Sequence, residues 1–221
     1  MDILLKIGDF WVRRYASPDP AALAAVAALT PATVVTGASE GLGFALARRI
    51  AREGRTIVLL ARSVDLLTEA ADNLRASYPN SNVIAASLDV GEKDAPGKLD
   101  ALLASHGLYL DVLVNNAGIG LGGHFTDLDQ EKLDELVETN VAAVTRLTRY
   151  YLSPMRARGR GGIMNLASLA AFSPGPWQAP YFASKAYVLS LTAAIGGECA
   201  GEACACAPSP AGQSRRASTA K

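Results

Sequence analysis

The fold is decided by one stretch of the chain, Thr36-Gly37-Ala38-Ser39-Glu40-Gly41-Leu42-Gly43. Residues 32–35 before it are an apolar run, and residues 44–51 after it have the apolar spacing of a helix. A strand, a glycine turn and a helix in this order are typical of a dinucleotide site, because glycines let the backbone approach a pyrophosphate and the first helical amides attract it. Tight turns also need glycine for steric reasons, so the turn alone leaves both interpretations open.

Apolar runs alternate with helical patterns along the rest of the chain. Continuous apolar runs at residues 56–61, 82–88, 110–114 and 162–167 predict strands that are buried on both faces. Helical patterns at residues 66–77, 94–106, 129–151 and 181–195 lie between and after them. This alternation predicts an α/β fold, a Rossmann-type doubly wound parallel sheet with right-handed crossovers.

Composition excludes several classes of protein. The 221 residues include 21 basic and 21 acidic side chains, so we expect no nucleic-acid partner. We expect no transmembrane segment and no signal peptide, and therefore a cytoplasmic protein. The three cysteines all lie at or after Cys199, where no histidine accompanies them, so the sequence predicts neither a disulfide framework nor a metal site.

The chain divides into three predicted parts. Residues 1–31 are predicted to form a helical extension, since Ile3, Ile7, Phe10 and Trp11 have helical spacing before Pro18. We expect this extension to be an arm that covers a sheet edge or a partner subunit, with a peripheral membrane helix as the alternative. Residues 32–200 are predicted to form the dinucleotide-binding and catalytic domain, and residues 201–221 a tail.

Further motifs follow the glycine turn in a fixed order. Asn115-Asn116-Ala117-Gly118 comes after the fourth predicted strand, and Asn140 lies in the long predicted helix. Ser168 follows the fifth strand and precedes the pair Tyr181 and Lys185. Over roughly residues 32–195, this ordered set resembles the short-chain dehydrogenase/reductase family.

The chemistry of the tyrosine–lysine pair follows from its spacing. On a helix, Tyr181 and Lys185 project from the same face, and a nearby cation favours the phenolate of a group that normally titrates near pH ~10. The resemblance implies that Tyr181 is the general acid/base and that Lys185 lowers its pKa and binds the nicotinamide ribose. It also implies that Ser168 hydrogen-bonds the substrate oxygen and that Asn140 holds a water in the proton relay.

The nucleotide end of the site is also implied by the resemblance. An acid is expected about 20 residues beyond the glycines, where it would bind the ribose of NAD, but the chain has Ala61-Arg62-Ser63 there. Arg62 can pair with a 2′-phosphate, so the sequence predicts NADP, with NAD as the second choice. The remaining cofactor contacts implied are Gly37, Ser39, Glu40, Gly41, Leu42, Gly43, Asp89, Val90, Asn116, Ala117, Gly118, Tyr181 and Lys185.

Residues 201–221 depart from the family pattern. The resemblance predicts a further strand there, but the chain contains Ala203-Cys204-Ala205-Cys206-Ala207-Pro208-Ser209-Pro210, which predicts an aberrant, disordered tail without a strand. Back-translated with GC-rich codons and read in another frame from Glu202, the same bases encode a strand-like run. We therefore expect a truncated or frameshifted C-terminus, with C-terminal strands missing from the sheet and an exposed edge and apolar face.

Two functions remain after these observations. The first is an NADP-dependent oxidoreductase that interconverts a carbonyl and a secondary alcohol by hydride transfer. The second is a catalytically impaired nucleotide-binding or interaction protein derived from such an enzyme. Residues 120–125 and 170–179 are expected to face a small-molecule substrate, whose apolar character Phe172 and Trp177 suggest. The helices that contain Asn140 and Tyr181 are expected to form the contacts of a homo-oligomer.

Overall fold

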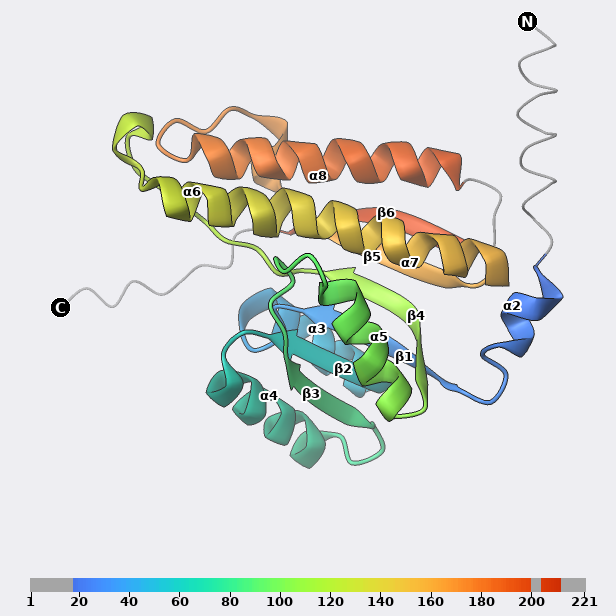
Figure 1. The fold of residues 1–221 in the computed structure, drawn as a ribbon. Helices are drawn as coiled ribbons and strands as arrows, with labels where there is room; N and C mark the ends of the chain where they lie inside the picture. The colour runs from blue at the N-terminus through green and yellow to red at the C-terminus, as the bar shows by residue number, and fades with distance from the viewer. Residues whose placement is uncertain (1–17, 200–203, 212–221) are drawn as a thin grey trace, which may run out of the picture.

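The computed structural model describes residues 18–199 and the backbone of residues 204–211 (Figure 1). The predicted helical arm, residues 1–17, lies outside the described residues. Six parallel strands form one sheet in the order β3-β2-β1-β4-β5-β6, which confirms the predicted doubly wound fold. The strands are β1 (Thr30–Thr36), β2 (Thr56–Ala61), β3 (Val83–Ser87), β4 (Leu108–Asn115), β5 (Gly161–Ser168) and β6 (Cys204–Ala211).

Helices cover both faces of this sheet and bury a core on each. On one face, α3 (Gly41–Ala51) and α4 (Val64–Ser77) pack against alternate residues of β1 and β2, such as Val35 and Leu59. On the other face, α5 (Ala95–Ser105) and α7 (Val144–Arg158) pack against the intervening residues, such as Val34 and Leu60. The strands are apolar on both faces because both are covered, as the continuous apolar runs predict.

The long helix predicted at residues 129–151 is divided in the structure. It consists of α6 (Gln130–Val137), a π-helical turn (Glu138–Ala143) and α7, which continues to Arg158. The wide turn contains Asn140, whose side chain bonds to the backbone outside the helix. Wide turns of this kind frequently lie at functional sites.

Two further helices and two 3₁₀ turns complete the description of the chain. Helix α2 (Pro20–Ala24) precedes β1, and α8 (Ala179–Glu198) follows β5 after a short 3₁₀ turn (Leu169–Phe172). A second 3₁₀ turn (Phe125–Asp127) lies before α6. None of the helices in residues 18–199 is long and apolar enough to cross a membrane.

The sixth strand corrects the expectation for the tail. The tail was expected to contain no strand, and this is wrong for Cys204–Ala211, which form β6 and pair in parallel with β5. An edge strand is hydrogen-bonded to one neighbour only, so it tolerates proline on its free side. Pro208 and Pro210 are two residues apart, so the backbone N–H groups that they lack would point to the same side of the strand. The parallel sheet therefore continues beyond residue 200.

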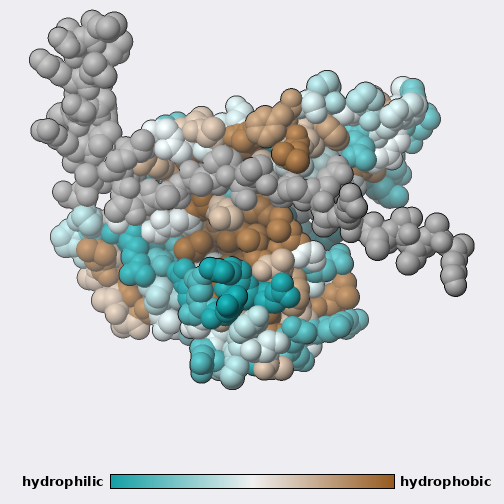
Figure 2. Space-filling model, turned by 180° about the vertical axis from the view of Figure 1, so that it is seen from behind, coloured by the Kyte–Doolittle hydropathy of each residue, from teal (hydrophilic) through white to brown (hydrophobic). Residues whose placement is uncertain are grey.

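Apolar side chains of β4 and β5 are incompletely covered on the face of α3 and α4. Val112 and Met164 are half-buried there and pack at the margin of the buried core. Helix α3 lies behind the strands in Figure 1. Figure 2 shows the molecule from behind, and therefore the face on which α3 lies, with a brown apolar patch beside hydrophilic residues. Among the described residues, no helix follows β6 to cover this part of the sheet.

Candidate active site

The glycine turn has a geometry that side chains would prevent. Gly37 and Gly41 have φ of +62° and +59°, a conformation that favours glycine. A Cβ on Gly43 would lie 2.2 Å from the carbonyl oxygen of Gly37 and 2.4 Å from Nδ2 of Asn116. The turn therefore brings the start of α3 directly against the backbone that follows β1, with Ser39 and Glu40 in the connecting loop.

The start of α3 supplies the amides expected for a phosphate. The first helical bond runs from the Phe44 amide to the carbonyl oxygen of Glu40, at 3.2 Å. The amides of Gly41, Leu42 and Gly43 precede it and have no acceptor within the helix. These three amides and the positive end of the helix dipole fit a pyrophosphate.

Asn116 connects the glycine turn to the end of β4. Its Nδ2 donates to the carbonyl oxygens of Thr36 and Gly37, each at 2.9 Å. The Thr36 hydroxyl oxygen accepts from the amides of Asn116 and Ala117, each at 3.0 Å. Asn116 thus stabilises the glycine turn through its side-chain hydrogen bonds. Thr36 bonds to the same segment, and the sequence analysis did not predict it as a residue of the candidate site.

A small pocket unites most of the residues predicted for the adenosine end. Its volume is about 80 Å³, and its lining includes six of the predicted contacts, which are Gly37, Arg62, Asp89, Val90, Ala117 and Gly118. They come from four different strand ends, which a parallel sheet brings to one edge. Thr139, next to Asn140, also lines this pocket and was not predicted.

Arg62 is paired with an acid in this structure. Its Nη1 donates to Oε1 of Glu135 on α6 and lies 3.9 Å from Oδ2 of Asp89. The hydrogen bond to Glu135 raises the pKa of the Arg62 guanidinium. Both side chains remain substantially exposed, and a guanidinium has five N–H donors, so the bond to Glu135 leaves donors for a further partner.

Lys185 is buried beside Tyr181. Its Nζ donates to the carbonyl oxygen of Leu166 at 2.9 Å and lies 5.8 Å from the centre of the Tyr181 ring. Only 7% of Lys185 is exposed, and burial lowers the pKa of its ammonium to about 8. The Nζ also lies 3.5 Å from where a Cβ of Gly118 would be, so the ammonium is next to the turn that follows β4.

Asn140 and Ser184 form a chain of hydrogen bonds behind Tyr181. The Asn140 side chain accepts from the amide of Ile119 at 2.8 Å and donates to the carbonyl oxygen of Ile119 at 2.9 Å. Asn140 Nδ2 also donates to Ser184 Oγ at 3.1 Å, and Ser184 Oγ donates to the carbonyl oxygen of Tyr181 at 2.7 Å. Ser184 is thus a second residue that the sequence reasoning missed, although it lies inside the Tyr181–Lys185 motif.

Ser168 ends β5 on the same edge of the sheet. Its side-chain oxygen accepts from the amide of Ala170 at 3.2 Å, and the residue is buried. The hydroxyl keeps its own O–H as a donor, because accepting one bond does not use it. The Ser168 hydroxyl therefore caps the following 3₁₀ turn as an acceptor and still offers a hydrogen-bond donor at the end of β5.

The two segments expected on the substrate side lie against each other. The amide of Gly123 donates to the carbonyl oxygen of Trp177 at 2.7 Å, and the rings of His124 and Trp177 are 5.6 Å apart. Trp177 has φ of +68°, the one positive φ outside glycine among the described residues. Such backbone strain is concentrated at functional sites.

Comparison with known proteins identifies the family of the chain. A family model described as short chain dehydrogenase matches residues 31–210. An uncharacterized oxidoreductase of Staphylococcus epidermidis is 32% identical over 162 residues, which are 73% of this chain and 68% of that protein. The chain spans from about half to about two thirds of the length of the curated relatives that it matches.

Solved structures are similar in fold. A metagenomic short-chain oxidoreductase in complex with NADP superposes with a TM-score of 0.74 at 33% identity, over 85% of this chain and 84% of that one. A short-chain dehydrogenase from Sphingobium yanoikuyae in complex with NADPH superposes with a TM-score of 0.76 at 29% identity, over 84% of this chain and 72% of that one.

Proposed function

Since the chain belongs to the short-chain dehydrogenase family, whose members are oxidoreductases that act on CH–OH groups with NAD(P), we propose that it interconverts a carbonyl and a secondary alcohol with NADP, using Tyr181 as general acid/base. The observation that supports this most is the burial of Lys185 within 5.8 Å of the Tyr181 ring. A lysine is rarely buried without a role for its charge.

The choice of NADP rests on Arg62 and on the lack of an acid at the end of β2. Arg62 lines the pocket at the adenosine end, where its guanidinium can meet a 2′-phosphate. The NADP and NADPH bound to the similar solved structures support the same choice. Glu135 competes for the guanidinium, so NAD stays the second candidate.

Four residues of the chain take part in the proton transfer that we propose. The Tyr181 hydroxyl gives its proton to the carbonyl oxygen during reduction and takes it back during oxidation. Lys185 favours the phenolate whenever it is charged, and the O–H of Ser168 donates to the substrate oxygen. Asn140 holds a water in the proton relay, and NADP, when bound, supplies or accepts the hydride.

We propose an apolar carbonyl or alcohol as the substrate. Phe172 and Trp177 are 68% and 65% exposed on the segment that joins Ser168 to the helix of Tyr181. The exposed rings and the strained backbone of Trp177 suit contact with an apolar molecule better than contact with water.

The second candidate function is nucleotide binding without turnover. The observation that favours it is the half-buried apolar surface at Val112 and Met164, over which no described helix packs. An active-site wall that is incomplete on this side would leave the hydride acceptor open to water.

One experiment separates the two functions. NADPH is added to the purified chain, its binding is followed by fluorescence, and its oxidation is then followed by absorbance with a panel of apolar ketones. Binding followed by oxidation supports the oxidoreductase, whereas binding without oxidation with every ketone supports the second function. A chain that binds neither NADPH nor NADH contradicts both.

A further inference from the structure

The loop between β3 and α5 contains two of the residues predicted to contact the cofactor. Asp89 and Val90 line the pocket at the adenosine end, and they lie after the end of β3 at Ser87 and before the start of α5 at Ala95. Neither a strand ladder nor a helix therefore fixes their backbone. The loop has a turn of its own, in which the amide of Gly91 donates to Oδ1 of Asp89 at 2.8 Å. Its place at the pocket depends on contacts from other parts of the chain.

The guanidinium of Arg146 on α7 binds this loop through the loop backbone. Nη1 of Arg146 donates to the carbonyl oxygens of Val90, Gly91 and Glu92, at 3.4, 3.3 and 3.1 Å. The Arg146 side chain is 23% exposed, so these bonds are largely shielded from water. Bonds from a charged donor are stronger than those from a neutral one. One side chain of α7 therefore fixes three consecutive residues of the loop.

The same guanidinium also binds the π-helical turn that precedes α7. Nη2 of Arg146 donates to Oε1 of Glu138, the first residue of that turn. Thr139, the next residue of the turn, lines the pocket at the adenosine end. The loop and the turn are in contact, since a Cβ on Gly91 would lie 3.4 Å from Cγ of Glu138. Arg146 thus connects two of the segments that line this pocket.

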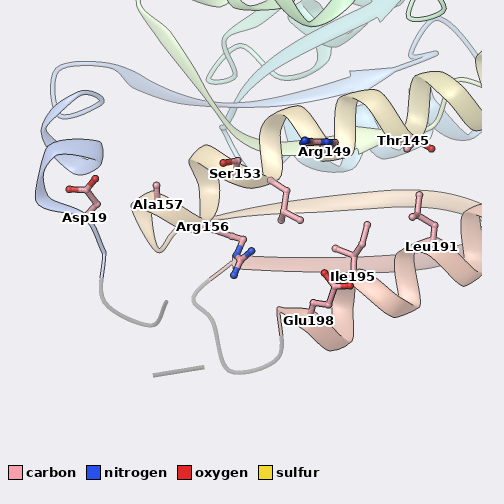
Figure 3. Close-up of a pocket in the computed structure, with 10 residues that line it drawn as sticks. Asp19, Thr145, Arg149, Ser153, Arg156, Ala157, Leu191, Ile195 and Glu198 are labelled. Atoms are coloured by element: carbon pink, nitrogen blue, oxygen red, sulfur yellow. The ribbon is translucent and has the colours of Figure 1, made fainter. Parts of the chain in front are cut away.

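Arg146 is directed to these two segments and not to helix α8. Thr145 and Arg149 of the same helix line the groove between α7 and α8 that Figure 3 shows. Arg146 lines neither that groove nor the pocket at the adenosine end. Its action on a cofactor would therefore pass through the loop and the turn that it binds.

We propose that Arg146 is a positioning residue for the adenosine half of the cofactor, an inference that rests on the proposed function. It fixes the loop of Asp89 and Val90 before the cofactor arrives. Without Arg146 the loop has to be ordered during binding, and this loss of conformational entropy weakens the affinity. The planar guanidinium reaches the carbonyl oxygens and the carboxylate together, whereas the ammonium of a lysine is a single point charge.

The nicotinamide half is expected to be independent of Arg146. Lys185 is fixed by its own bond to β5. Asn140 lies in the π-helical turn, but its side chain is fixed by bonds to Ile119 and Ser184. These bonds do not involve Arg146. Its loss should therefore weaken the binding of adenosine and leave the chemistry at the nicotinamide intact.

Two fragments of the cofactor test the proposal in the variant Arg146→Met. Adenosine 2′,5′-bisphosphate represents the adenosine half, and its dissociation constant is measured by calorimetry, without turnover. Reduced nicotinamide mononucleotide represents the other half, and its oxidation is followed with the best ketone of the panel. We expect Arg146→Met to bind the bisphosphate about tenfold more weakly and to have a higher KM for NADPH. Its kcat and its rate with the mononucleotide should stay close to those of the parent chain.

Two further variants complete the test. Arg146→Lys keeps the charge without the planar guanidinium, so it should lose affinity for the bisphosphate to a smaller extent than Arg146→Met. Arg52→Met makes the same substitution at an exposed arginine, at the C-terminal end of α3, and is the matched control. It should leave every one of these measurements unchanged.

Two results would overturn the proposal. The first is an unchanged affinity for the bisphosphate in Arg146→Met, or in Arg146→Lys if Arg146→Met fails to fold. The second is an equal loss of rate with NADPH and with the mononucleotide, which would show a general loss of structure.

Failure of the proposed function would look different. A parent chain that binds the bisphosphate but oxidises no NADPH would contradict the oxidoreductase, while the affinities of the variants for the bisphosphate would still decide the role of Arg146. A parent chain that does not bind the bisphosphate would contradict the assignment of the cofactor and this inference together.

Discussion

Lys185 lies in surroundings that oppose its own charge. Its only described acceptor is the carbonyl oxygen of Leu166, while the protein around it excludes water. Burial lowers the pKa of this ammonium to about 8, so the group loses its proton more easily in the folded chain than in the unfolded chain. The structure thus maintains an unfavourable charge beside Tyr181, as expected of a functional residue rather than a stabilising one.

Replacing Lys185 is therefore expected to separate stability from activity. Below pH ~8 the folded and the unfolded chain both hold the proton on Lys185, and the free-energy cost of burying the charge is complete. Between about pH 8 and 10.5 the unfolded chain holds a proton that the folded chain lacks. In this range the free energy of unfolding therefore rises with pH. Lys185→Met removes the cost, so the free energy of unfolding at about pH 7 should not fall, its rise above pH ~8 should shrink, and turnover should be lost. Urea unfolding at several pH values measures this, and a loss of stability in the variant at neutral pH would contradict it.

Glu135 is expected to modulate the choice between NADP and NAD. It competes with a 2′-phosphate for Arg62, and an exposed ion pair is worth about 0.2–1 kcal/mol, which corresponds to a few-fold change. Glu135→Gln should thus raise the ratio of kcat/KM for NADP to that for NAD by a few-fold, and Arg62→Ala should lower it. Steady-state kinetics with both cofactors measures the ratio. If Glu135→Gln lowered the ratio, Glu135 would be a residue that positions Arg62 for the phosphate.

At the scale of elements, the turn between β1 and α3 depends on the absence of side chains. The backbone that follows β1 and the side chain of Asn116 both occupy the space beside Gly43. By contrast, a Cβ on Gly97 in α5 would meet nothing within 4 Å. The two glycines therefore allow a matched comparison of the same substitution.

Gly43→Ala and Gly97→Ala should have opposite effects. At Gly43 the methyl group must displace backbone, which should weaken NADPH binding by at least tenfold and lower the melting temperature. At Gly97 alanine should stabilise the helix by about 0.5–1 kcal/mol and leave NADPH binding unchanged. Thermal unfolding and NADPH titration of both variants measure the contrast. Unchanged cofactor binding in Gly43→Ala would show that the turn is not part of the cofactor site.

A buried polar network joins the helices of the active site to the sheet. Asn115 Nδ2 donates to Asn165 Oδ1 at 2.8 Å, and Asn165 Nδ2 donates to Thr192 of α8 at 3.0 Å. Thr148 of α7 also donates to Asn165 Oδ1, at 3.3 Å. Buried polar groups that are all satisfied favour one packing arrangement, so this network fixes α7 and α8 relative to β4 and β5.

The sequence was sufficient for most of the helices and strands, but not for β6 or for contacts between distant residues. Continuous apolar runs revealed the parallel strands, and the helical spacing of Tyr181 and Lys185 indicated that the two side chains lie near each other, at 5.8 Å between Nζ and the ring centre. The ion pair of Arg62 with Glu135 joins positions 73 residues apart, and no local pattern indicates such a contact. The strand at the edge was missed because its alanines, cysteines and prolines have low strand propensity, whereas pairing with β5 supplies the hydrogen bonds.

At the scale of the whole molecule, the sheet is well covered at β1 to β3 and poorly covered at β4 and β5 on the side of α3. The reading-frame hypothesis offers a cause, since a frame change near residue 202 would replace the segment that follows α8. The nucleotide sequence tests it: the alternative frame should encode a strand-like run similar to that of the family at the positions of β6. A frame without such a run would end the hypothesis.

The central claim concerns Tyr181, and the most direct test compares two tyrosines of α8. Tyr181→Phe removes the proposed acid/base, whereas Tyr187→Phe removes a hydroxyl that bonds to Thr145 on the outer side, at 2.9 Å. The measurement is the rate of NADPH oxidation with the best ketone of the panel, with NADPH affinity measured alongside. We predict that Tyr181→Phe binds NADPH normally and loses about 10²–10⁴-fold in rate, and that Tyr187→Phe retains the rate of the parent chain. Equal rates for the parent chain and Tyr181→Phe would contradict the account.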